Sequence, residues 1–269
     1  MDFEKFQRII LNNKRNKELV EDKLKIFYSE ANMESGDDLL DIMQIARTLI
    51  IKTGFLLAEI PLKNAEIGAV CYSGNGSKYV LLNSSLPRVN ANFSLCHEIY
   101  HILYQNHCIK ESAELYMPDN YYEHEEEMAA NCFAASLMMP EQSFTKMFNK
   151  FKLESEEAKS ELHVIAKLMN YFKAPYMAVL IRCYELELLK DGNSLKKLLN
   201  IDKDIINNEF NALWLNGELL EASRKDDFTK LLELVSKKGQ YLVSRELMRE
   251  VEFEKIKNNI KRIYEEIRG

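Results

Sequence analysis

Apolar residues recur at helical spacing over most of the chain. Between residues 38 and 52 they repeat three and four positions apart, which predicts an amphipathic helix that stops at Gly54. From about residue 90 onward the same spacing predicts helices over 91–107, 123–138, 141–150, 159–172 and 175–190, with several more after 195. Pro140 and Pro175 mark the end of one of these helices and the beginning of another. The second half of the chain is therefore expected to be almost entirely helical.

A β-like pattern is confined to residues 55–83. Three short apolar runs, at 55–60, 67–72 and 79–82, predict strands, and the turn residues at 73–77 predict a hairpin between the last two. The Gly-x-Gly within this turn precedes no helix, so a hairpin is favoured over a phosphate-binding loop. We expect an α+β fold in which a small antiparallel sheet packs on a helix and a mostly helical C-terminal part follows.

These patterns divide the chain into three parts. Residues 1–36 are charged and are expected to form an N-terminal helical arm, residues 37–190 form the main domain, and residues 191–269 form a helical C-terminal extension. Trp214, Leu215 and the run 231–235 give the extension apolar faces, but no motif predicts its role. Because 46% of the residues are hydrophobic and 29% are charged, the chain has ample material for a core, which excludes bulk disorder.

Charge and cysteine usage narrow the class of protein. The formal net charge of −6 argues against broad electrostatic binding of nucleic acid, and all of it falls within residues 1–190. The five cysteines form no CxxC pair, which indicates reduced thiols rather than a disulfide framework. The first residues lack the pattern of a signal peptide, and no stretch approaches the length of a membrane span. We therefore expect a cytoplasmic protein with no membrane partner.

The sharpest chemical signal is the segment 97–101, which reads His-Glu-Ile-Tyr-His. Residues four apart lie one above the other on a helix, so the imidazoles of His97 and His101 can hold one metal ion. Glu98 lies one step round the helix, where its carboxylate can act on a water as a general base. The alternative interpretation is an amphipathic helix with two half-buried histidines.

A second predicted helix could complete a metal site. A catalytic zinc ion takes three protein ligands, commonly two histidines and one carboxylate, and keeps one position open. Glu127 and Asn131 are four residues apart, so they share one face of this helix and could both face the site. The small residues that follow them would let the two helices approach closely.

Two segments resemble conserved blocks of the ImmA/IrrE family of metallo-endopeptidases. Residues 93–101, FSLCHEIYH, are similar to the family's F-T-L-A-H-E-L-G-H, and residues 127–140, EMAANCFAASLMMP, are similar to its E-x-x-A-N-x-F-A-A-x-L-L-M-P. A weaker third block covers 165–182, so the resemblance extends over about residues 37–190. It implies a zincin-like fold and a metal cofactor, Zn²⁺ with Mn²⁺ as the alternative.

The resemblance also implies a role for each residue of the motifs. His97, His101 and Glu127 correspond to the metal ligands, and Glu98 corresponds to the catalytic glutamate. Asn131 either orients Glu127 or serves in packing and hydrogen bonding between helices. The nearby alternatives for the third ligand are Glu125, Glu126 and His124.

Several further side chains have a structural and a chemical interpretation. Cys96 is expected to be a buried free thiol rather than a ligand, while His107 and Cys108 are expected to cap the end of the first motif helix. The bulky side chain that replaces the family's usual glycine, Tyr100, is expected to alter packing rather than ligation. Three side chains are candidates for stabilising an oxyanion, although a structural role is the simpler interpretation for each: Tyr171, Tyr176 and Arg182.

The function implied by the resemblance is zinc-dependent, site-specific cleavage of a helix-turn-helix transcriptional repressor in a bacterial mobile-element or stress-response switch. The alternative is a non-catalytic protein of the zincin fold that binds DNA or a repressor. The helical pair at 159–190 has some likeness to a helix-turn-helix, but the helix from Pro175 carries only Arg182 before Lys190. Direct binding of nucleic acid is therefore not expected.

Overall fold

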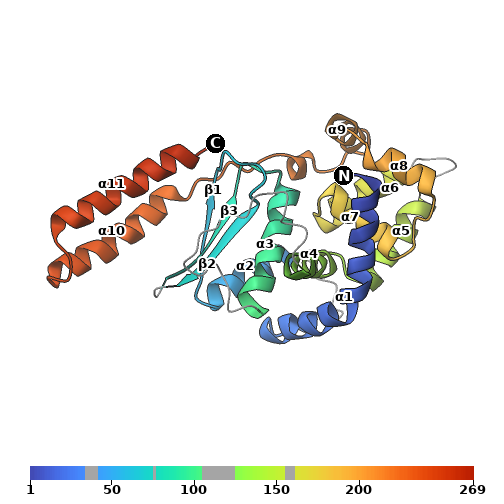
Figure 1. The fold of residues 1–269 in the computed structure, drawn as a ribbon. Coiled ribbons are helices and arrows are strands. Elements are labelled where there is room, and N and C mark those ends of the chain that lie inside the picture. The colour runs from blue at the N-terminus through green and yellow to red at the C-terminus, as the bar shows by residue number, and fades with distance from the viewer. Residues whose placement is uncertain (34–41, 75–76, 105–124, 155–160) are drawn as a thin grey trace.

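The computed structural model describes residues 1–33, 42–74, 77–104, 125–154 and 161–269. A small sheet lies at the centre, helices pack on one side of it, and a two-helix hairpin projects on the other (Figure 1). The predicted α+β class with a mostly helical C-terminal part is confirmed. The predicted divisions after residues 36 and 190 stay predictions, and residue 36 itself lies outside the described residues.

The sheet has three strands in the order β1-β3-β2, namely β1 (Leu56–Ile60), β2 (Ala69–Gly74) and β3 (Ser77–Asn83). The predicted hairpin joins β2 and β3, which run antiparallel with Cys71 opposite Val80. The prediction of a wholly antiparallel sheet is wrong, because β1 pairs with β3 in parallel, with Ala58 opposite Leu81. After β1 the chain crosses to the opposite edge of the sheet to form β2, and β3 then pairs between β1 and β2. The periodicity of each strand does not predict this order.

Three helices surround the motif segment. Helix α3 (Arg88–Tyr104) packs between the sheet and α4 (Glu125–Met138), and α2 (Ile42–Lys52) packs against α3 and β1. Ala130 and Ala134 of α4 are completely buried, and their small side chains allow the close approach predicted for the two helices. Helix α1 (Phe3–Glu30) packs against α4, where the Phe27 ring lies edge-on to Phe133. The motif helix is thus held between the sheet, α2 and α4, with Leu95 and Ile99 buried in the core.

The remaining helices of the main body extend the same core. They are α5 (Glu141–Leu153), α6 (Glu161–Phe172), α7 (Tyr176–Glu185), α8 (Gly192–Leu199), α9 (Lys203–Ala212) and the short 3-10 helix η1 (Gly217–Leu220). Pro140 and Pro175 stand immediately before α5 and α7, where a proline costs no hydrogen bond. Leu195 and Phe210, from the part predicted as an extension, are buried in the same hydrophobic cluster as the residues of α3 and α4.

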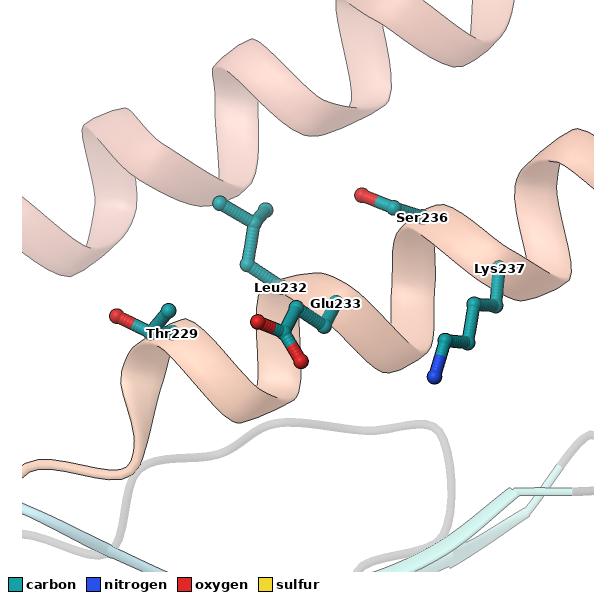
Figure 2. Close-up of a pocket in the computed structure, with 5 residues that line it drawn as sticks. All are labelled: Thr229, Leu232, Glu233, Ser236 and Lys237. Atoms are coloured by element: carbon teal, nitrogen blue, oxygen red, sulfur yellow. The ribbon is translucent and has the colours of Figure 1, made fainter.

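The last two helices, α10 (Phe228–Ser244) and α11 (Glu250–Ile267), form the projecting hairpin (Figure 1). Backbone hydrogen bonds join its base to the chain around β1: the N–H of Asp227 donates to the carbonyl of Glu59 over 2.8 Å, and that of Lys63 donates to Ile267 over 2.8 Å. A shallow pocket on α10 is lined by side chains from one face of the helix (Figure 2), namely Thr229, Leu232, Glu233, Ser236 and Lys237. Within the described parts of the chain, no helix is long and apolar enough to cross a membrane.

Candidate metal centre

The C-terminal half of α3 carries three buried polar side chains. His97 and Glu98 are each 6% exposed and His101 is 9% exposed. Leu95 and Ile99 on the same helix are buried in the core, so the helix cannot turn these polar groups towards water. Because a buried polar group without a partner is costly, the site must supply partners from a neighbouring element.

Glu127 in the first turn of α4 supplies the carboxylate. Its Oε2 lies 3.1 Å from Nε2 of His97 and its Oε1 lies 3.5 Å from Nε2 of His101. The two Nε2 atoms lie 3.0 Å apart. The ligand atoms of these three residues all lie within 4.8 Å of one another, so the group could hold a metal ion. Two imidazole nitrogens and one carboxylate are the donor set of many catalytic zinc sites.

Asn131, one turn further along α4, contacts the first histidine. Its Oδ1 lies 3.0 Å from Nδ1 of His97. When Nδ1–H donates to this oxygen, the lone pair of Nε2 is left pointing towards Glu127 and His101. Of the two roles considered for Asn131, the structure therefore favours a hydrogen bond between helices, and its partner is His97 rather than Glu127.

The environment pushes the pKa values of the two carboxylates apart. Burial raises the pKa of Glu98 above its ordinary value, although the neighbouring His97 and His101 oppose this effect. Burial also opposes ionisation of Glu127, but its hydrogen bonds and charge interactions with the two histidines outweigh burial and hold its pKa well below the ordinary range. Divergent pKa values in adjacent carboxylates are typical of sites where one binds as an anion and the other moves a proton.

The alternative metal ligands either lie apart from the group formed by His97, His101 and Glu127 or fall outside the described residues. Glu125 and Glu126 are exposed and do not belong to the convergent group. Cys96 is completely buried, as predicted, and burial raises the pKa of its thiol. His107, Cys108 and His124 lie outside the described residues.

Aromatic packing accounts for the side chain that replaces the family's usual glycine. Tyr100 is 4% exposed and packs edge-on against Phe133, with the ring centroids 5.8 Å apart. The Lys23 ammonium of α1 lies 4.8 Å from the Tyr100 ring centroid. Tyr100 thus connects α3 to α4 and α1, as the prediction of a packing role implies, and the cation over its ring was not foreseen because α1 is distant in sequence.

The three candidates for oxyanion stabilisation have structural contacts. Buried Arg182 donates from Nε to the carbonyl of Met139 and from a terminal nitrogen to Glu185. The hydroxyl of Tyr176 donates to the carbonyl of Leu198 over 2.9 Å. The third candidate, Tyr171, is 49% exposed and packs against two phenylalanine rings. These contacts favour the structural interpretation.

An HExxH helix held between a small sheet and a helix that provides a carboxylate is the arrangement of zincin-type metallopeptidases. Residues 52–184 match the Peptidase_M78 family model, described as the IrrE N-terminal-like domain. This match assigns the segment 52–184 to the ImmA/IrrE peptidase family, as the sequence motifs indicate. No curated protein and no solved structure matched the chain in the corresponding searches. The family supports a metallopeptidase type of function.

Proposed function

We propose that this chain is a zinc-dependent endopeptidase in which His97, His101 and Glu127 bind the metal and Glu98 is the general base. The observation that carries the proposal is the convergence of two imidazole Nε2 atoms and the Glu127 carboxylate within 4.8 Å, directly beside a buried glutamate. Family membership supports it, because peptidases of this family are typically metal-dependent.

The donor set fits zinc for two reasons. The contact between Nδ1 of His97 and Asn131 leaves the Nε2 lone pair available, and the Glu127 carboxylate lies beside the Nε2 atoms of both histidines. Imidazole nitrogen is a preferred donor for Zn²⁺, whereas Mn²⁺ prefers sites built mainly from oxygen. Zn²⁺ is therefore proposed as the resident metal, with Mn²⁺ as the alternative.

Glu98 has the properties that a general base for peptide hydrolysis needs. A zinc ion in the site would supply Lewis acidity, which polarises a scissile carbonyl and activates water. The Glu98 carboxylate accepts the proton of the attacking water and passes it to the departing amine. Because burial raises the pKa of Glu98, its carboxylate is a stronger base towards water than that of an exposed glutamate.

For the substrate, we propose a helix-turn-helix transcriptional repressor, cut at a specific site in the cytoplasm of a bacterium as part of a mobile-element or stress-response switch. The resemblance to the ImmA/IrrE family is the main support. The charge distribution agrees with it: residues 1–190 hold 21 basic and 27 acidic side chains, which leaves the whole net charge of −6 on the part that contains the site. Such a surface suits a basic, DNA-binding protein as partner.

The test is to incubate the zinc-loaded full-length chain with a purified helix-turn-helix repressor from the same genome and to follow fragment formation by mass spectrometry. The wild-type chain is expected to cut at one site, and Glu98→Gln is expected to lower the rate by about 10²–10⁴-fold while it still binds zinc. Glu125→Gln, the same change at an exposed acidic residue outside the convergent group, serves as the matched control and should cut at the wild-type rate.

Different outcomes contradict different parts of the proposal. A Glu98→Gln variant that cuts at the wild-type rate would show that the assigned mechanism is wrong. An intact repressor together with cleavage of an unrelated peptide library would refute the substrate and leave the peptidase. Specific binding of the repressor without cleavage of either substrate would support the non-catalytic alternative instead.

A further inference from the structure

Exposed apolar side chains gather on the α10–α11 hairpin. Its side chains of this kind include Leu234, Tyr241, Ile256, Ile263 and Ile267, which are between 40% and 58% exposed. Single exposed apolar residues are ordinary, but several on one projecting element indicate a surface that another protein covers. The hairpin stands clear of the main body over most of its length (Figure 1).

On α11 the apolar residues follow a heptad pattern. Phe253, Ile256, Ile260, Ile263 and Ile267 are separated alternately by three and four residues, which is the spacing of a coiled-coil seam. Phe253 is 4% exposed and packs so closely on α10 that a Cβ at Gly239 would lie 2.0 Å from its ring. Ile256 and Ile263 on the same seam are each 42% exposed. The hairpin therefore buries one edge of the seam and leaves the other edge open.

The apolar residues of α10 extend towards the same side. Successive residues of a helix are rotated by about 100° around its axis, so Leu242 and Leu234 lie about 60° and 140° from Gly239 in one direction. The polar residues Glu233 and Lys237, which line the pocket of Figure 2, are rotated from Gly239 in the opposite direction. On α11, the rotation about the helix axis from Phe253 to Ile256 has the same direction as the rotation from Gly239 to Leu242 on α10. Because the helices are antiparallel, equal senses of rotation place these residues on one common face.

The base of the hairpin is firmly attached to the main body. Glu59 of β1 is 7% exposed, and its carboxylate pairs with Arg47 of α2 over 2.8 Å and with Lys225 over 3.1 Å. Asp227 at the start of α10 accepts the N–H of Glu59 over 3.1 Å and pairs with Lys230 over 2.9 Å. This ionic cluster fixes the direction of the hairpin, so its apolar face is presented in one orientation.

The charges beside the apolar face favour a second copy of the hairpin as its partner. On α10, Lys238 and Arg245 are rotated by about 100° and 120° from Gly239, which places them between Leu242 and Leu234 on this face. On α11, Glu252 and Glu266 lie beside the exposed edge of the seam, where they pair with Arg249 and Arg262 of their own helix. A two-fold axis parallel to the helices would set α10 of one copy against α11 of the other, so that a basic edge meets an acidic edge. Isoleucine at both positions of a heptad seam also favours assemblies of more than two helices.

We propose that the apolar face of the α10–α11 hairpin is a self-association surface, on which the hairpin of a second copy of this chain packs to form an antiparallel four-helix bundle. In this dimer the exposed edge of the α11 seam becomes the bundle core. Lys238 of each copy then lies beside Glu252 of the other. This proposal is independent of the proposed peptidase activity.

Sedimentation velocity of the full-length chain over a wide concentration range tests the proposal. The wild-type chain is expected to sediment with twice the monomer mass of 31.4 kDa. Replacing two exposed seam residues, Ile256→Glu with Ile263→Glu, is expected to raise the dissociation constant by about 100-fold or more. The matched control is Leu153→Glu, which changes an 84% exposed apolar residue of α5 and should leave the mass unchanged. Circular dichroism checks that each variant is folded.

A charge-reversal pair tests the predicted orientation. Lys238→Glu is expected to weaken the dimer by about tenfold, because it brings two acidic edges together, and adding Glu252→Lys is expected to restore the wild-type affinity. A wild-type chain that is monomeric at every concentration overturns the proposal, as does a dimer that survives the two isoleucine replacements with the fold intact. Failure of the charge-reversal pair to restore affinity overturns the antiparallel arrangement.

Discussion

Oδ1 of Asn131 on α4 lies 3.0 Å from Nδ1 of His97 on α3, so the His97 imidazole contacts α4 at both ring nitrogens, Asn131 at Nδ1 and Glu127 at Nε2. The contact with Asn131 selects the tautomer that leaves Nε2 for a metal. Asn131→Ala is expected to weaken zinc affinity by about 10–100-fold, measured by competition with a chromophoric chelator. Asn131→Asp keeps an acceptor oxygen at the same place and should retain most of the affinity. Equal zinc affinity in the alanine variant and the wild-type chain would contradict this role.

Metal removal is expected to lower stability without unfolding the chain. The helices of the site are held by apolar packing, with Leu95, Ile99 and Phe133 completely or almost completely buried. A metal at about 100 times its dissociation constant contributes about 2.7 kcal/mol. In a chain of this size, its removal by a chelator should lower the melting temperature by about 5–10 °C. Loss of the helical circular dichroism signal at room temperature would instead indicate a structural metal.

Asp227 is expected to make the attachment of the hairpin sensitive to acid. Burial opposes its ionisation, but hydrogen bonds from Lys230 and the Glu59 N–H, together with Lys225, outweigh burial and lower its pKa. A lowered folded-state pKa means that the stabilisation is fully present above the unfolded value of about 3.9 and is lost as pH falls through the folded value. Asp227→Asn should therefore lower the free energy of unfolding by about 1–3 kcal/mol at neutral pH and by much less in strong acid.

Chemical denaturation at both pH values measures this difference. The control is Asp22→Asn on α1, where the carboxylate is 72% exposed in an ion pair with Lys25. An exposed pair of this kind contributes less than about 1 kcal/mol, so the control should change stability little. A constant effect of Asp227→Asn from neutral pH to strong acid would show that its charge is not the cause.

Gly239 is expected to resist replacement although it lies within a helix. Alanine in a helix is normally favoured over glycine by about 1 kcal/mol. Here a Cβ would lie 2.0 Å from Cε2 of Phe253, so Gly239→Ala must displace this buried ring and is expected to cost about 1–3 kcal/mol. The matched control is Gly192→Ala at the start of α8, where a Cβ meets nothing within 4 Å and should be neutral or stabilising. Thermal unfolding compares the two, and a Gly239→Ala variant as stable as its control would contradict the close packing.

Local features of the site were predictable because they depend on spacing alone. His97 and His101 share a face of α3 because they are four residues apart, and the same rule places Asn131 on the face of Glu127. The contact between Asn131 and His97 was not predictable, because it depends on how far α4 is rotated and shifted against α3. The alanines of α4 indicated close approach, but several rotations satisfy them equally well.

Sequence by itself determined the helices, the hairpin of β2 and β3, the HExxH pair and the family, because each is encoded in short-range periodicity or in contiguous motifs. Only the tertiary structure decided the parallel pairing of β1 with β3, the partner of Asn131 and the ionic cluster that ties Glu59 to Asp227. These contacts join residues that are far apart in the sequence: 23 positions separate the partners of the β1–β3 pairing, such as Ala58 and Leu81, and 168 positions separate Glu59 and Asp227. Their geometry follows from the packing of whole elements around one core, a constraint that no short segment carries.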